Sequence, residues 1–89
     1  FRSAINRVVK PGDVVLDAGA GSGILSFFAA AAGARKVYSV EYDSGLAELL
    51  RQNAARNGFA EVIEVITGDV RELHLPVQAD VLIAELIET

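Results

Sequence analysis

The 89-residue sequence has no cysteine, which excludes disulfide bonds and zinc sites built on thiolates. No apolar run approaches the roughly 18 residues that a membrane-spanning helix needs. Secretory, transit and lipidation signals are not recognisable either. We therefore predict a cytoplasmic protein without a membrane partner. The first residue is Phe1 and not methionine, so the sequence can be part of a longer chain.

Basic residues are scarce, with 8 lysines and arginines against 12 acids and a net charge of −4. This balance does not match a phosphate backbone, so we expect no direct nucleic-acid binding by this segment. The single histidine, His74, has no cysteine or second histidine to share a metal with, and we place it in a surface loop. No metal site is predicted. The length admits one domain at most.

Short apolar runs alternate with amphipathic stretches along the whole chain. We expect strands at 14–16, 36–40, 62–67 and 81–84, helices at 1–10, 24–32 and from Asp43 or Ser44 to Asn57, and a connection at 71–78. Strands that alternate with helices predict an α/β fold with a parallel sheet. The apolar faces predicted for the second and third helices are Ile24, Phe27, Phe28 and Ala31, and Leu46, Leu49, Leu50 and Ala54.

A glycine-rich turn, VVLDAGAGSG, joins the first strand to the second helix. Gly19, Gly21 and Gly23 can adopt positive φ and have no Cβ, so a ligand can approach the main chain closely. Dinucleotide folds use G-x-G-x-x-G, but here the third glycine comes one residue early. The turn predicts a site for a nucleoside-type ligand. A tight turn without a ligand is the alternative.

An acid follows each of the four predicted strands: Asp17, Glu41, Asp69 and Glu85. The carboxyl ends of parallel strands lie along one edge, where ligands of open α/β sheets bind. Four carboxylates would repel a pyrophosphate, but they suit a cation or a sugar diol. Each also has a structural alternative, namely a turn or capping carboxylate for Asp17, an Asx turn for Asp69, and a solvated strand end for Glu41 and Glu85.

The spacing Asp17-x-Gly19-x-Gly21-x-Gly23 resembles the first motif of the class I S-adenosylmethionine-dependent methyltransferases. Within that class, the runs VLDAGAGSGILSFFAAAAGARKVYSVE and LPVQADVLIAE are similar to the protein arginine methyltransferases, and the ending ELIET resembles archaeal predicted RNA methylases. The resemblance covers nearly the whole chain. It implies a Rossmann-like, partial three-layer αβα sandwich with strands ordered 3-2-1-4.

The resemblance also implies S-adenosyl-L-methionine as the cofactor, held by the glycine turn and the acids. Glu41 would accept the two ribose hydroxyls, and Asp17 would orient the methionine end through the glycine turn or a water molecule. Asp69 would accept the adenine amino group. Tyr42 and Val70 complete the predicted cofactor site, with Tyr42 placed to pack against adenine.

Glu85 is the predicted catalytic residue, because it matches the first acid of the active-site pair in the arginine methyltransferases. It would grip a guanidinium or another amine-like acceptor, and orientation supplies much of the rate in such transfers. Arg71 stands where those enzymes commonly carry an adenine-contacting glutamate, which leaves that contact to Asp69. The predicted reaction is in-line transfer of the sulfonium methyl to a nitrogen or oxygen nucleophile.

The acceptor is left open between protein arginine and RNA. Two alternatives of other classes are a nicotinamide-nucleotide module and a scaffold without catalytic activity. Four of the seven strands of a class I domain are recognisable, so we predict that residues 1–89 are the cofactor-binding half of a longer chain. The strand at 81–84 would then be an open edge, and two copies could instead pair through it into a homo-oligomer.

Overall fold

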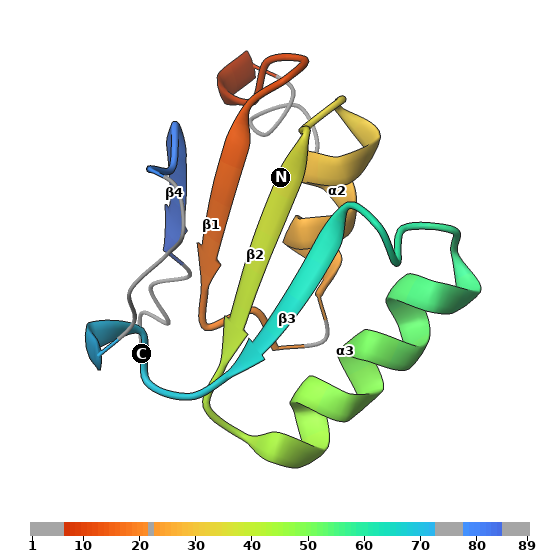
Figure 1. The fold of residues 1–89 in the computed structure, drawn as a ribbon, viewed down its shortest axis with the longest axis vertical. Helices are drawn as coiled ribbons and strands as arrows, with labels where there is room; N and C mark the ends of the chain where they lie inside the picture. The colour runs from red at the N-terminus through yellow and green to blue at the C-terminus, as the bar shows by residue number, and fades with distance from the viewer. Residues whose placement is uncertain (1–6, 22, 73–77, 85–89) are drawn as a thin grey trace.

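The computed structural model describes residues 7–21, 23–72 and 78–84, which form a parallel sheet in the order β3-β2-β1-β4 (Figure 1). The elements are β1 (Val14–Ala18), α2 (Ile24–Ala31), β2 (Lys36–Glu41), α3 (Ser44–Arg56), β3 (Ile63–Thr67), the 3-10 turn η1 (Val70–Glu72) and β4 (Val81–Ala84). The predicted α/β fold and strand order are confirmed. Most of the helix predicted at 1–10 lies outside the described residues.

Strand β2 is buried along both of its faces from Val37 to Glu41, which is typical of a central strand in a parallel sheet and explains its largely apolar sequence. Val15 and Val37 are fully buried at the centre of the sheet. The chain passes from β1 to β2 to β3 in one direction, and right-handed crossovers then place α2 and α3 on the same face. Accordingly α2 contacts β1 and β2, while α3 contacts β2 and β3. One helical layer of the predicted sandwich is therefore in the described part of the chain.

The predicted apolar face of α2 was right in part, because Phe27 and Phe28 are partly buried and pack against the core. The buried residues are Leu25, Ser26 and Ala29, whereas Ile24 is 55% exposed and Ala31 is exposed. A serine lies on the core face because its hydroxyl has a buried partner, described below. A prediction from the apolar residues alone therefore missed Ser26 and placed the centre of the buried face at the wrong residues.

The predicted face of α3 was right in part. Leu50 and Ala54 are buried, but Ala47 replaces Leu46 and Leu49, which are 39% and 45% exposed. The small side chains of Ala47 and Ala54 let the helix approach the sheet closely, which centres the contact on them and leaves the two leucines at its margin. Asp43 caps the helix by accepting from the Leu46 N–H at 3.0 Å, as expected of an N-cap aspartate.

Strand β4 lies at the outer edge of the described sheet, beside β1. Asp80 joins the two strands, since its carboxylate accepts from the Val14 N–H at 2.8 Å and its own N–H donates to the Val14 carbonyl at 2.7 Å. Leu82 on this strand is 63% exposed. Pairing of two copies through this edge stays a prediction. None of the helices in the described part of the chain has the length and apolar composition needed to cross a bilayer.

Candidate functional site

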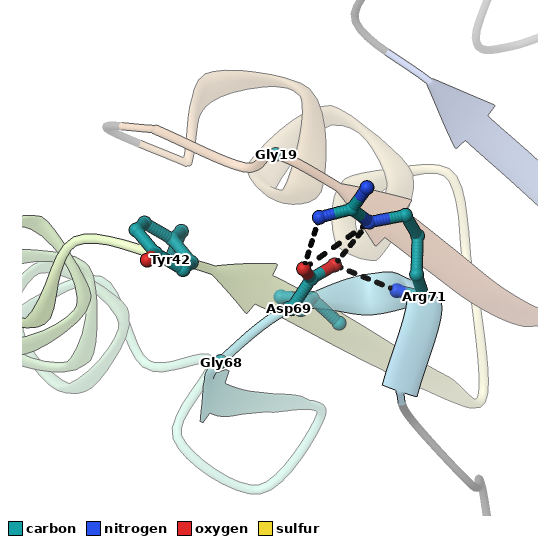
Figure 2. A pocket seen from close by; sticks show the side chains of 6 residues that line it. Gly19, Tyr42, Gly68, Asp69 and Arg71 are labelled. Atoms are coloured by element: carbon teal, nitrogen blue, oxygen red, sulfur yellow. Dashed lines mark hydrogen bonds and ion pairs between the residues drawn. The ribbon is translucent and has the colours of Figure 1, made fainter.

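The carboxyl ends of β1, β2 and β3 point to the same edge of the sheet, the lower edge in Figure 1. A cavity of about 370 Å³ opens there. Its lining residues are Gly19, Val40, Tyr42, Gly68, Asp69 and Arg71 (Figure 2). This volume falls within the range of roughly 300–1,000 Å³ that small-molecule sites occupy.

The glycine turn that forms one wall has the predicted backbone geometry. Gly19, Gly21 and Gly23 have φ values of 73°, 58° and 92°, the left-handed region that favours glycine. The turn is tied to β2, because the N–H groups of Gly19 and Ala20 donate to the Val40 carbonyl at 2.9 and 3.0 Å. A Cβ on Gly23 would lie 2.9 Å from Leu50 Cγ. The third glycine is therefore required both by its φ and by the packing of the turn on α3.

Glu41 lies at the end of β2 between two residues that line the cavity, Val40 and Tyr42. Only 8% of it is exposed, which argues against a merely solvated strand end. Its Oε1 accepts from the Gly21 N–H at 2.7 Å, and its Oε2 accepts from the Asp43 N–H at 2.9 Å. Each carboxylate oxygen can accept about two hydrogen bonds, so each keeps one position for a ligand hydroxyl.

Asp17 does not open onto the crevice, which corrects the prediction that all the strand-end acids face one site. It is the fourth residue of β1, pairs in register with Ser39 of β2, and is 1% exposed. Its Oδ2 accepts from the Ser26 hydroxyl at 2.6 Å, and the hydroxyls of Ser26 and Ser39 lie 2.6 Å apart. Because the single Ser26 proton goes to Asp17, the bond between the serines must be donated by Ser39. Asp17 therefore links β1 to α2, the two elements that the glycine turn joins.

The sequence did not predict either serine as part of the site. Both are completely buried. The available signal was one serine inside each of two mostly apolar segments, ILSFFAAA and KVYSVE, because a buried polar group needs a hydrogen-bonding partner.

Asp69 lines the cavity and forms an ion pair with Arg71. Its Oδ2 accepts from Arg71 Nη2 at 2.6 Å and from Nε at 3.1 Å, while its Oδ1 accepts from Nε at 3.0 Å and from the Arg71 backbone N–H at 2.9 Å. These bonds lower the pKa of Asp69 to about 2, with the side-chain hydrogen bonds as the main cause. The same contacts raise the pKa of Arg71. The Asx-type bond foreseen as the structural alternative for Asp69 is thus present.

The other predicted site residues have mixed outcomes. Tyr42 lines the cavity and is 78% exposed, so one ring face is available to a ligand. Val70 belongs to η1, directly after Asp69. Glu85, the predicted catalytic residue, lies outside the described residues.

The described residues fit an adenosine-type ligand. A preorganised carboxylate with two open acceptor positions suits a ribose diol, and an exposed aromatic ring beside it suits a base. The turn offers bare backbone where a ligand can approach closely. A pyrophosphate would instead meet the carboxylates of Glu41 and Asp69 close to the turn, which is unfavourable for two like charges.

This sheet, turn and acid pattern define a class I S-adenosylmethionine-dependent methyltransferase fold. The family model described as the TRM5/TYW2 methyltransferase domain matches residues 1–89, and the chain belongs to this family.

Three relatives illustrate the similarity. The chain is 46% identical over all 89 residues to an uncharacterized protein of Methanocaldococcus jannaschii, of which it covers 34%. The structure of the Trypanosoma brucei PRMT1 enzyme-prozyme complex with AdoHcy matches 94% of this chain with 44% identity and a TM-score of 0.87, over 27% of its own chain. The structure of M. jannaschii Trm5 in complex with adenosine matches 96% with 33% identity and a TM-score of 0.84, over 26% of its own chain. The chain thus spans about a third or less of each relative.

Proposed function

We propose that this protein binds S-adenosyl-L-methionine at the described sheet edge and transfers its methyl group to a nitrogen nucleophile. The observation that carries the proposal is the Glu41 carboxylate. Two backbone N–H groups hold it in place, and a carboxylate oxygen that accepts one hydrogen bond has the capacity to accept another. Such a fixed pair of acceptors matches two neighbouring hydroxyls of a ribose.

The remaining residues have complementary roles in this proposal. Tyr42 packs against the adenine, while Asp69, with Val70 beside it, receives the amino group. Asp17 keeps the glycine turn in the conformation that faces the methionine end. The bound cofactor supplies a methyl group on a sulfonium, which a nucleophile displaces in line. Glu85 would orient that nucleophile, and this role rests on the sequence resemblance alone.

Protein arginine is the acceptor that we favour. The matched chain of the PRMT1 complex has 44% sequence identity to this chain, whereas the Trm5 chain has 33%. RNA is the second candidate, and the family match to the TRM5/TYW2 domain supports it. Methyl transfer from labelled cofactor to an arginine peptide and to transfer RNA, compared side by side, distinguishes the two. The proposal also includes residues 1–89 as the cofactor-binding half of a longer catalytic domain. A cytoplasmic location stays a prediction.

Calorimetric titration of the intact protein with S-adenosylhomocysteine tests the cofactor site. Glu41→Gln keeps the shape of the side chain, but it turns an amide N–H toward one of the two backbone N–H groups. Losing a hydrogen bond to a charged acceptor weakens binding by about 10- to 100-fold. Glu64→Gln is the matched control, since Glu64 lies on β3, 53% exposed, in a surface pair with Lys36. Equal affinity of both variants, or binding of NADH in place of S-adenosylhomocysteine, would contradict the proposal.

A further inference from the structure

One wall of the cavity carries a cation, Arg71, beside an acid, Asp69. The Arg71 side chain is 85% exposed and the Asp69 side chain only 21%, so the guanidinium lies on the solvent side of a partly covered carboxylate. Figure 2 shows the guanidinium bonded along the carboxylate, with Tyr42 apart from both. Both residues line the cavity, so a ligand that reaches Asp69 also meets Arg71.

The pair changes what the acid can offer to a ligand. Three N–H groups of Arg71 make four hydrogen bonds to the two oxygens of Asp69. A carboxylate has only about four acceptor positions, so these bonds use most of its capacity. An amino group that approaches Asp69 must compete with the guanidinium. A ring carbonyl oxygen would be repelled by a free carboxylate, but it can accept a hydrogen bond from an N–H of the guanidinium that Asp69 leaves unused.

We propose that Arg71 determines base selectivity at this site: its ion pair with Asp69 weakens the preference for a 6-aminopurine over a 6-oxopurine. This inference rests on the proposed function, because it requires the base of the cofactor to lie against Asp69. Exposed ion pairs contribute modestly, so the effect of the pair on affinity is about two- to five-fold.

Titration of the intact protein with S-adenosylhomocysteine and with S-inosylhomocysteine, in which a ring carbonyl replaces the amino group, measures this selectivity. In Arg71→Ala, we expect about two- to five-fold tighter binding of the amino ligand and unchanged or weaker binding of the oxo ligand. Lys36→Ala is the matched control, because it removes one partly exposed cation from an ion pair at the opposite end of β2. It should leave both affinities unchanged.

Asp69→Asn, made alone and with Arg71→Ala, tests whether the effect passes through the carboxylate. Asparagine keeps an oxygen for the Arg71 backbone N–H, so the turn is retained. The selectivity gained in Arg71→Ala should disappear in the double variant. Unchanged or lower affinity for S-adenosylhomocysteine in Arg71→Ala, or an equal gain for both ligands, overturns this inference and leaves the proposed function standing. Absence of binding in the wild-type protein overturns both.

Discussion

Replacing Ser26 with alanine breaks the chain of buried hydrogen bonds that connects β1, α2 and β2. The hydroxyl of this residue, itself fully buried, donates to Asp17 at 2.6 Å and accepts from Ser39. The substitution removes both bonds and takes a donor from a carboxylate that is 1% exposed. It adds no atom, so the change in stability reports on the two hydrogen bonds.

The expected loss follows from the charges of the partners. A hydrogen bond to a charged group contributes about 1.5–3 kcal/mol, and a neutral one contributes about 1 kcal/mol. Alanine has a higher helix propensity than serine, which offsets about 0.5 kcal/mol of this loss in stability. We expect Ser26→Ala to lower the free energy of unfolding by about 2–3.5 kcal/mol, and Ser39→Ala, which loses the neutral bond, by about 1 kcal/mol. The double variant should lose about 1 kcal/mol less than the sum, since both single changes remove the same bond.

Urea unfolding of the intact protein measures these differences at constant m-value. Ser44→Ala is the matched control, because Ser44 is an exposed serine in the first turn of α3, where Asp43 is the capping residue. Its stability should change by less than about 0.5 kcal/mol. Equal stability of Ser26→Ala and Ser44→Ala would refute the buried chain, and strict additivity of the two core serines would refute the bond between them.

Two further predictions concern the turn and the ion pair. Gly23→Ala should lower the free energy of unfolding by at least about 2 kcal/mol, because its φ is 92° and its Cβ would meet Leu50. Gly58→Ala, with φ 80° and open space, should lose about 1 kcal/mol, and equal losses would contradict the clash. Arg71→Ala should be less stable than wild type at neutral pH by an amount that disappears in acid. The pKa of Asp69 is lowered from 3.8 to about 2, so the stabilisation is complete above about pH 4 and is lost as the pH falls to 2. A difference in urea-unfolding stability that does not vary with pH would contradict this cause.

The strand pattern of the fold could be predicted because each strand is a short apolar run bounded by turn residues. Val81–Ala84 was predicted residue for residue. Strand β1 is two residues longer than expected, since pairing with β2 and β4 continues through Ala18. The helix faces were harder to predict, because the position of each helix depends on which small residues let it approach the sheet. Ala47 and Ser26 have little weight in a hydrophobic pattern, yet both are buried.

A site residue could be predicted from the sequence where its position depends only on the end of a single strand. Glu41 and Asp69 lie at the expected edge because parallel strands end together. The partners of the acids depend on contacts between distant segments. Ser26, which contacts Asp17, is nine residues further along the chain, and no local pattern links the two. The Asp69–Arg71 pair had a local signal, an acid two residues before a cation in a turn after Gly68, but that spacing alone does not distinguish an ion pair from two solvated charges.

The acids of this site differ in how they are held, and this difference separates affinity from selectivity. Glu41 is fixed by two backbone N–H groups, and Asp17 by a buried hydroxyl, so both are oriented before any ligand arrives. Asp69 is held by an arginine whose side chain is 85% exposed. A change at Glu41 or Asp17 must therefore disturb the turn and β2 together with ligand binding. A change at Arg71 alters the choice of base while the sheet beneath it stays intact, which is why selectivity can vary at this wall without loss of the fold.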